Sequence, residues 1–421
     1  MMKLAYPICC GVDVHKKVIV ATIVFTNELG ISTYLQKSFT TINSDIKAFH
    51  NWLILNNCYH VCMESTGKYW IPIFNYLESD INVCLTHPKY VRAIKGKKTD
   101  KKDSKWIADL YKFDLVRNSF IPPKDIRQLR EIARYRFKLV CMKASEKNRI
   151  QNAMTVSNIG IASILCDPFC KTATDIISYL LEHSAEAFDE KACRKLIRKG
   201  AEAKSDDIIA AINGYQIESD QALKFRLAQD HLNYIENMIT QTEVELYVRI
   251  KPYWELVELI STIPGITSLS ATIILAEIGT NMCVFEDAKH LTSWAGLTPA
   301  NNESAGKKKS VRIGKGGQYL KPLFIQCALS AIRNQKQPYF NIKYQRIKRR
   351  RGHKKAIIAI SRMMLICIYH IIKEKKVFNP TDYVDLMDSQ THQDKVLLNE
   401  KTVFEYLEEH GYDISNLVKK N

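Results

Sequence analysis

Two motifs are missing from this sequence of 421 residues, and each absence excludes a class of protein. The 12 cysteines include no CxxC pair, and neither of the two CxxxC pairs has a histidine placed to complete a zinc site. The nucleotide-binding loop GxxxxGK(S/T) is absent as well, because Gly67-Lys68 lacks the upstream glycine. We therefore expect reduced, mostly buried thiols in a cytosolic protein, and no nucleotide cofactor.

The sequence also lacks an apolar run long enough to cross a membrane, which takes roughly 20 residues. The N-terminal apolar run is too short for a signal peptide. The segment Ala356–Ile372 is strongly apolar, but Arg362 and His370 interrupt it. It is predicted to be a buried core helix, and no membrane partner is expected.

What the sequence has in excess is positive charge: 61 Lys and Arg against 44 Asp and Glu give a formal net charge of +17. The pI is about 9.2. This excess indicates a polyanionic partner, and nucleic acid is a better candidate than an anionic membrane. The alternative is a basic protein without such a partner. The length exceeds what one core normally organises, so two or three domains are expected.

Residues 1–122 are predicted to form a mixed α/β domain, because strand patterns alternate with helix patterns up to Pro122-Pro123. Asn43 and Ser44 are expected to cap a helix that continues to Leu55. The predicted strands lie at residues 8–14, 17–25, 31–39, 59–64 and 82–86.

Four acidic residues of this domain are candidate metal ligands. Asp13 lies in the first strand, Glu64 ends the fourth, and Asp100 and Asp103 share one face of a helical turn. Acids at the ends of neighbouring strands and on a facing helix can converge on Mg²⁺, which prefers oxygen ligands. An acid buried in the first strand is costly without a partner. For the others a solvated surface carboxylate is the alternative, and His15 is expected to be a satisfied polar residue.

Residues 123–250 are predicted to form a long helical hairpin with a helical insert at 157–220. Apolar residues recur at three- and four-residue spacing in both long helices, which is typical of an intramolecular core or a dimer seam. Arg130 and Arg134 belong to an arginine-rich face that we expect to contact RNA or DNA backbone. The cationic run that contains Lys98 predicts a phosphate-tracking groove, with a solvated face as the alternative.

Residues 251–376 are predicted to form a mostly α-helical domain with a candidate nucleophile. Pro264-Gly265-Ile266 resembles the turn of a helix-hairpin-helix element, which presents backbone N–H groups to a phosphate; an ordinary helical turn is the alternative. Ser304 lies in a small-residue loop and could attack a phosphodiester once a base or metal activates it. Ser310 is the alternative nucleophile. The cations expected to bind nucleic acid here are Lys307, Lys308, Lys309, Arg312 and Lys315.

Two segments remain after the serine loop. A strongly basic stretch runs from Lys343 to Lys355. The more acidic residues 377–421 are expected to form an appended helical tail of unknown use.

Several of these motifs resemble one family of transposases. The resemblance is to the insertion-sequence transposases of the one-ten (IS110) type, with three DEDD motifs followed by a serine region. Ala305 departs from the pattern, where Ser, Thr or Gly is expected, but it keeps the small size. The resembling segments are Gly11–Lys16, Met63–Gly67, Lys98–Asp103, Trp294–Pro299 and Ser304–Lys307.

This resemblance implies a RuvC-like N-terminal domain with an RNase H core and a C-terminal transposase domain. It also implies a recombinase that is guided by a structured non-coding (bridge) RNA and acts on donor and target DNA in a prokaryotic cytoplasm. The family works as a dimer of dimers, in which the carboxylates of one subunit meet the serine of another. Here those would be Mg²⁺-binding Asp13, Glu64, Asp100 and Asp103, with Ser304 forming a covalent phosphoserine link to DNA. Such a link stores the energy of the broken bond, in agreement with the missing nucleotide-binding loop.

Two other functions are open alternatives. A junction-resolving nuclease of the RuvC type would use metal-activated water in place of Ser304. A non-catalytic RNA-binding assembly protein would bind RNA tightly and exchange no DNA strands.

Overall fold

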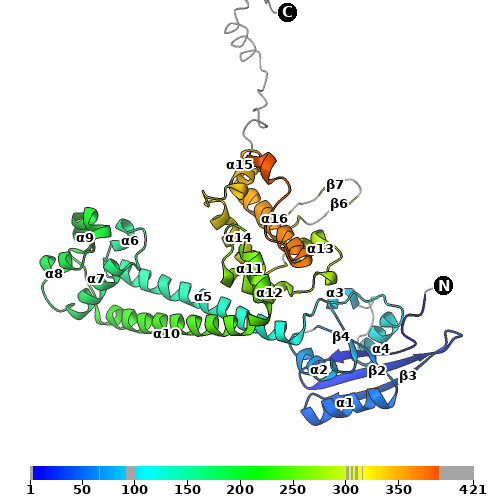
Figure 1. Cartoon of the computed structure of the whole chain (residues 1–421). Helices are drawn as coiled ribbons and strands as arrows, with labels where there is room; N and C mark the ends of the chain where they lie inside the picture. The colour runs from blue at the N-terminus through cyan, green and yellow to red at the C-terminus, as the bar shows by residue number, and fades with distance from the viewer. Residues whose placement is uncertain are drawn as a thin grey trace, which may run out of the picture. The chain divides into compact units, whose positions relative to one another are not determined.

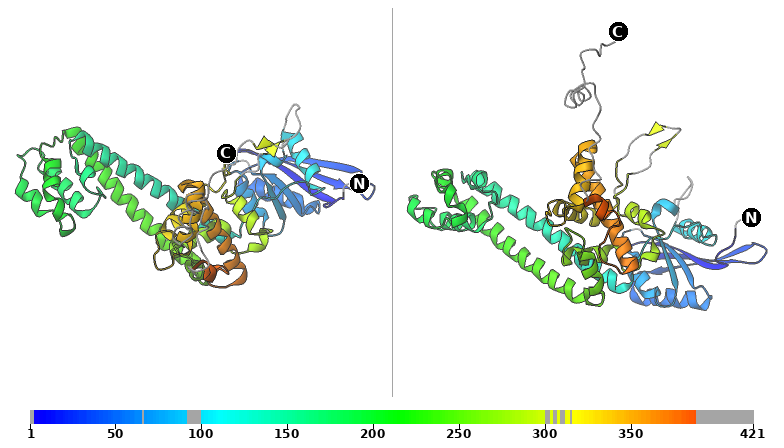
Figure 2. Two further views of the ribbon diagram at one scale, coloured as in Figure 1. Left: turned by 90° about the horizontal axis from the view of Figure 1, so that it is seen from above. Right: turned by 45° about the horizontal axis from the view of Figure 1, so that its top comes forward.

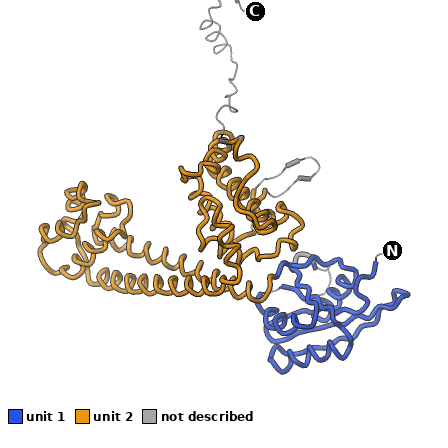
Figure 3. Tube along the Cα trace, in the orientation of Figure 1, with its two compact units in different colours: residues 1–121 blue, residues 122–421 orange. Residues whose placement is uncertain are grey.

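The computed structural model divides the chain into two compact units, residues 1–121 and 122–421 (Figure 3). It describes residues 3–65, 67–91, 100–299, 303–304, 307–308, 312–314 and 316–387.

Unit 1 is built on a five-stranded mixed sheet of order β3-β2-β1-β4-β5 (Figure 1). The first three strands are antiparallel neighbours, whereas β4 and β5 run parallel to β1. Every predicted strand is present within one residue at either end, so the mixed α/β prediction is confirmed. The strands are β1 (Ile8–Val14), β2 (Val18–Thr26), β3 (Ser32–Thr40), β4 (His60–Glu64) and β5 (Asn82–Thr86).

Helices pack on both faces of this sheet, because alternate strand residues point to opposite sides. Cys10 and Val12 belong to the core shared with α1 and α2, whereas Cys9 belongs to the core shared with α4. The expected capping of α1 by Asn43 and Ser44 is wrong, since the N-cap is Ile42 and it makes no side-chain cap. The helices are α1 (Asn43–Leu55), α2 (Trp70–Leu77), α3 (Pro88–Val91) and α4 (Asp100–Tyr111).

Unit 2 begins with the antiparallel helices α5 (Lys124–Val156) and α10 (Ser219–Ile250), which lie side by side in every view (Figures 1 and 2). Leu129 and Leu139 of α5 and Leu232 and Leu246 of α10 are buried, so the predicted apolar stripe forms a core within the chain. Two members of that stripe differ from expectation, since Val140 and Met142 are 38% and 47% exposed.

Polar pairs cross this hairpin at successive levels. Arg136 donates to Glu243 Oε1 at 2.6 Å, and Lys143 Nζ lies 2.8 Å from Glu236 Oε1. One turn further along α5, the buried Glu146 pairs with His231 Nδ1 at 2.8 Å. As the position on α5 rises, the position of its partner on α10 falls, as expected of antiparallel helices.

A small helical subdomain with a core of its own joins the far ends of these two helices (Figure 1). It corresponds to the predicted insert at 157–220. Its elements are α6 (Ile161–Ile164), α7 (Lys171–Glu182), α8 (Glu190–Lys195), η1 (Lys199–Lys204) and α9 (Ser205–Ile212).

Most of the remaining helices of unit 2 pack around α16 (His353–Glu374). Within the described ranges, α16 has the length and apolar composition of a membrane-crossing helix, but 56% of its most apolar window is buried inside the fold. The prediction of a core helix is therefore confirmed. The other elements are η2 (Lys251–Tyr253), α11 (Trp254–Ser261), α12 (Ser268–Ile278), η3 (Met282–Val284), α13 (Ala288–Trp294), β6 (Glu303–Ser304), β7 (Lys307–Lys308), α14 (Leu320–Ala331), α15 (Tyr339–Arg351) and α17 (Tyr383–Met387).

The start of the predicted tail belongs to this helical domain. The ring of Tyr383 stacks on Tyr339 at 5.9 Å, and Phe378 stacks on Phe340 at 5.7 Å. Asp382 accepts a hydrogen bond from Tyr339 Oη at 2.8 Å. The domain therefore continues through α17, and residues 388–421 of the tail lie outside the described residues.

Candidate acidic site and serine loop

The acidic residues of unit 1 gather where β1, β4 and α4 meet. Val12 pairs with Met63 in the parallel β1–β4 ladder, so Asp13 and Glu64 follow at the same edge of the sheet. Asp100 and Asp103 lie in the first turn of α4, which packs across the opposite side of β1 from α1.

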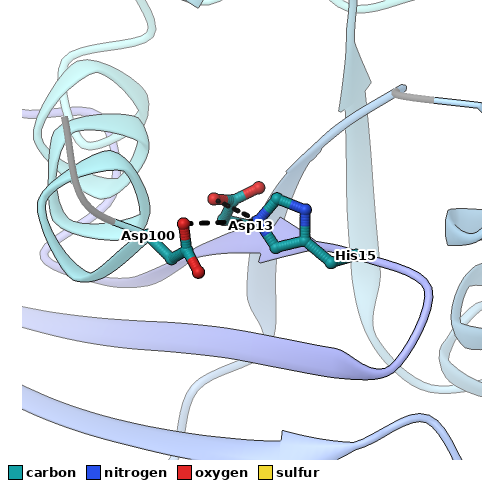
Figure 4. Close-up of side chains that lie close together, drawn as sticks. All are labelled: Asp13, His15 and Asp100. Atoms are coloured by element: carbon teal, nitrogen blue, oxygen red, sulfur yellow. Dashed lines mark ion pairs between the residues drawn. The ribbon is translucent and has the colours of Figure 1, made fainter.

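Figure 4 shows the closest part of this cluster, in which one ring nitrogen of His15 faces the carboxylates of both Asp13 and Asp100. His15 Nε2 is 3.2 Å from Asp13 Oδ2 and 3.5 Å from Asp100 Oδ1. One ligand atom from each of the three residues lies within 4.8 Å of the others. His15 is thus paired with carboxylates, as expected of a satisfied polar residue, and it lies where it could also serve as a metal ligand. The sequence already indicated that His15 lies near Asp13, because residues two apart point to the same face of an extended chain.

The pKa of Asp13 shows that the other acids contribute to the same site. Burial is the largest reason that this pKa lies above its ordinary value, and the nearby His15 opposes the shift. The negative charges of Asp100, Glu64 and Asp103 raise it further. The side chain of Asp13 is only 14% exposed. Negative charge is thus concentrated around a half-buried carboxylate.

A close approach of helix and strand holds Asp100 and Asp103 in this position. A Cβ on Gly11 would overlap backbone atoms of Ser104 and Ala108, so only glycine lets α4 lie this near β1. The buried hydroxyls of Thr22 and Ser104 are 2.7 Å apart.

Gln36 of β3 completes this link. Its amide Nε2 donates to Thr22 Oγ1 and to the Lys101 carbonyl, each at 2.8 Å. The first turn of α4 is therefore tied to two strands as well as packed on a third.

The donor set of this cluster suits a divalent cation. Carboxylate oxygens are the ligands that Mg²⁺ prefers, and a histidine nitrogen is accepted by first-row transition metals such as Mn²⁺. Repulsion among the acids also favours a bound cation, because a cation offsets the negative charge that raises the pKa of Asp13. The four predicted carboxylates and His15 are thus the residues that would hold a metal ion.

The loop that carries Ser304 belongs to unit 2. At its two ends, glycine residues pack closely against each other. Gly296 and Gly317 have positive φ angles of 67° and 71°, and a Cβ on Gly296 would lie 2.5 Å from the Gly316 carbonyl. Lys321 Nζ donates to the Gly314 carbonyl at 2.6 Å. These glycines allow two backbone segments to pack directly on each other.

Further out, the loop forms a short antiparallel ladder. Pro299 bridges to Ile313, and β6 then pairs with β7 so that Ser304 lies opposite Lys307. Glu303 lies opposite Lys308. The candidate nucleophile is therefore paired directly across the ladder with a cationic residue.

Arg130 and Arg134, which the sequence predicts to contact nucleic acid, make contacts within unit 2. Arg134 makes a bidentate pair with Glu277 at 2.7 and 2.8 Å, and its guanidinium lies 4.7 Å from the centre of the Tyr319 ring. Arg130 donates to the carbonyls of Ala276 and Glu277 at 3.0 and 2.7 Å. Burial lowers the pKa of Arg130 to about 10. Both arginines fasten α5 to the C-terminal end of α12, and their contact with nucleic acid stays a prediction.

Gly265 also has a structural explanation. Its φ is +86°, and a Cβ there would lie 2.5 Å from the Cys327 carbonyl of α14. The turn between α11 and α12 therefore needs glycine for packing, whether or not it binds phosphate.

The remaining predicted nucleic-acid-binding residues follow the serine. Arg312 is exposed, and Lys307 and Lys308 form β7. Lys98, Lys309, Lys315 and the alternative nucleophile Ser310 lie outside the described residues.

The twelve cysteines form no site of this kind. All are free thiols, and seven of them are buried. This agrees with the expectation of mostly buried thiols.

A mixed sheet of this order, with acids at the carboxyl ends of β1 and β4, fits an RNase H-like domain, a fold of metal-dependent enzymes that cut nucleic acids. Residues 10–159 match a family model of IS110 DEDD proteins, described as transposase. Residues 257–345 match the model described as the transposase IS116/IS110/IS902 family. The chain belongs to the IS110-type transposase family, as its motifs predicted.

Two curated relatives are similar over part of the chain. The pilin gene-inverting proteins of Moraxella bovis and Moraxella lacunata are each 30% identical to it over 157 residues. The match covers 36% of this chain and 48% of each relative. The chain thus spans about half the length of the curated relatives it matches.

Proposed function

We propose that this protein is a DNA transposase or recombinase that cuts and rejoins donor and target DNA through a phosphoserine intermediate. The observation that carries this proposal is the convergence of Asp13, Glu64, Asp100 and Asp103 at one edge of an RNase H-like sheet. The curated relatives support it, because they are named for inverting a pilin gene, which is a rearrangement of DNA.

The acidic cluster would hold Mg²⁺. When bound, the metal would polarise the scissile phosphate and lower the proton affinity of the attacking alcohol. Other residues of the chain hold these carboxylates in position. Gly11 lets α4 approach β1, and Thr22, Ser104 and Gln36 fix the first turn of α4. The carboxylates of the site therefore need little reorganisation before reaction.

Ser304 would be the nucleophile. Its Oγ forms a bond to phosphorus while the bond from phosphorus to a sugar oxygen breaks. A basic group of the site accepts the serine proton and passes a proton to the leaving sugar oxygen, which becomes a hydroxyl. A sugar hydroxyl of the second DNA strand then attacks the same phosphorus and displaces Ser304 Oγ, which recovers a proton. The number of phosphodiester bonds is conserved, so no nucleotide needs to be hydrolysed.

Guidance by a structured RNA and assembly as a dimer of dimers complete the proposal. The net charge of +17 supports binding of more than one nucleic acid. In this scheme base pairing with the RNA selects donor and target sequences, and the protein holds the backbones. The reaction would take place in the cytoplasm.

Purified protein with its co-purifying nucleic acid tests this function. After the RNA is sequenced and matching DNA is supplied, a denaturing gel should reveal a protein–DNA adduct, and peptide mapping should place it at Ser304. Ser304→Ala should abolish adduct and strand transfer, whereas the matched Ser310→Ala should retain both. Cleavage that survives Ser304→Ala would instead indicate a junction-resolving nuclease. Tight RNA binding without metal-dependent strand exchange would indicate an assembly protein.

A further inference from the structure

The end of α15 and the start of α16 carry a dense group of exposed cations. We define this cationic patch as the exposed residues on either side of Gly352 that carry a positive charge. Its members are Arg346, Lys348, Arg349, Arg350, Arg351, Lys354 and Lys355.

No acidic side chain nearby in the sequence neutralises this patch. From Ser304 to Lys373 the chain contains no Asp or Glu at all. The adjacent Lys343 pairs with Asp382, but no ion pair with a carboxylate is found for the patch within the described ranges. The last turn of a helix rises only ~5 Å, so the four cations of α15 from Lys348 onward are crowded together.

Helix electrostatics explains only part of this arrangement. Cations in the last turn of α15 interact favourably with its dipole. Lys354 and Lys355, however, lie in the first turn of α16, where a positive charge is unfavourable and where no acidic residue compensates it. The cost of this concentration of charge is removed when an external polyanion binds.

The aromatic residues of α15 indicate which kind of polyanion fits. Single-stranded nucleic acid is usually held by exposed aromatic rings on which bases stack. Tyr339, Phe340 and Tyr344 are all buried, and Tyr344 Oη hydrogen-bonds His353 Nδ1 at 2.7 Å. The patch therefore offers charge for a phosphate backbone, and the Tyr and Phe rings of α15 are not available for stacking on bases.

From these observations we infer that the cationic patch binds the sugar–phosphate backbone of duplex DNA without reading its sequence. All members of the patch lie beyond residue 345, where the second family match ends. The inference rests on the proposed action on DNA and adds a second contact surface to it. Such a surface would hold the duplex in place while the acidic cluster and the serine act.

The salt dependence of binding tests this inference. Full-length protein would be titrated against a mixed-sequence DNA duplex in EDTA, so that no cleavage occurs, and the slope of log K against log salt concentration would be measured. The triple variant Arg349→Gln/Arg350→Gln/Arg351→Gln should reduce the slope by about 2 to 3, since each lost phosphate contact contributes about 0.9. Affinity at 0.15 M salt should fall roughly 10- to 100-fold in consequence.

A matched control distinguishes an effect of the patch from an effect of the protein's net charge. Lys191, Lys195 and Lys199 are three exposed cations of the helical insert, and changing all three to Gln removes the same charge. This control should leave the slope unchanged, and both triple variants should keep the wild-type melting temperature. If the control lowers the slope as much as the patch variant does, or if the patch variant loses only RNA-duplex binding, the inference is overturned.

This experiment is independent of the proposed chemistry. Ser304→Ala should keep the wild-type salt slope even though strand transfer is lost. An unchanged slope in the patch variant would contradict the patch alone, whereas strand transfer by Ser304→Ala would contradict the proposed function alone.

Discussion

At the scale of single residues, His15 distinguishes this site from one made of carboxylates only. Its Nε2 lies 3.2 Å from Asp13 and 3.5 Å from Asp100, so a cation between the two acids would meet a nitrogen donor as well. Imidazole is a ligand for transition metals, whereas Mg²⁺ strongly prefers oxygen. The site should therefore accept Mn²⁺ at least as readily as Mg²⁺.

His15→Ala is expected to weaken Mn²⁺ binding by roughly tenfold or more, while Mg²⁺ binding changes less. Calorimetry measures both affinities, and pulsed EPR of the Mn²⁺ complex should show a nitrogen coupling that the variant loses. His370→Ala, which removes an exposed histidine of unit 2, is the control. An unchanged Mn²⁺ affinity together with no nitrogen coupling in the wild type would show that His15 is not a ligand.

Gly11→Ala is expected to disturb the same site by changing how α4 packs on β1. The added methyl group overlaps backbone atoms of Ser104 and Ala108, which cannot rotate away, so α4 must shift from β1. Overpacking of this kind costs about 1–3 kcal/mol, and metal affinity should fall as Asp100 moves. Thermal melting and metal titration check both effects. Gly200→Ala, where a Cβ meets nothing within 4 Å, should change neither.

Residue identities were predictable where local sequence carried the signal. An acid inside an apolar strand marked Asp13, and the strand pattern placed Glu64 at a strand end. The pairing of Arg134 with Glu277 was not predictable, because these residues are 143 positions apart and meet only in the folded chain. The internal contact of Arg134 could therefore be found only in the structure.

At the scale of elements, Glu277 links α12 to α5 of the hairpin through its ion pair with Arg134, and its side chain is only 5% exposed. Glu277→Gln leaves Arg134 with a neutral partner, and removing one charge of a buried pair costs about 3 kcal/mol. Denaturant unfolding should show this loss, and hydrogen exchange should increase at the end of α12.

The control for this prediction is Glu243→Gln. Its pair with Arg136 is more accessible to solvent, at 30% and 20% exposure. Its loss should cost about 1 kcal/mol or less. Equal destabilisation by the two variants would mean that Glu277 is not a specific anchor.

The stability contributed by the contact of Asp382 with α15 should depend on pH. Burial acts to raise the pKa of Asp382, but hydrogen bonds from Lys343 and Tyr339 outweigh it and hold the pKa below its ordinary 3.8. A carboxylate with a lowered folded-state pKa adds stability above pH 3.8, and this stability is lost as pH falls through the folded value.

Urea unfolding of wild type and Asp382→Asn checks this dependence. The wild type should be the more stable near pH 6, and the difference should shrink towards pH 3. A difference that stays constant over this range would rule out the ionised carboxylate as its source.

Helices and strands were predicted well because their periodicity is local. The turns and caps were less predictable. Asp45, and not Asn43 or Ser44, accepts hydrogen bonds from the Thr40 N–H and hydroxyl, at 3.0 and 2.7 Å. The exposure of Val140 and Met142 likewise depends on where α10 lies, which the sequence of α5 does not encode.

At the scale of the whole molecule, the acidic cluster and the serine belong to different compact units. If the reactive pocket combines the acids of one subunit with the serine of another, then Asp13→Asn and Ser304→Ala chains should complement each other. Each variant alone should be inactive. Co-expressed in equal amounts, they should restore up to about a quarter of the wild-type strand transfer, because half of random pairs are mixed and each mixed pair holds one intact site.

Strand transfer by the co-expressed chains, measured with the guide RNA and both DNA partners, is the readout. A chain carrying both substitutions, co-expressed with either single variant, is the control and should stay inactive. Failure to complement, with normal assembly, would mean that acids and serine act within one chain.

The register of the α5–α10 hairpin restricts how such proteins can change length during evolution. A deletion in one arm alone would slide Arg136, Lys143 and Glu146 past their partners and rotate apolar side chains into water. Descendants with a shorter hairpin should therefore have lost stretches of equal length from α5 and from α10, in multiples of about seven residues.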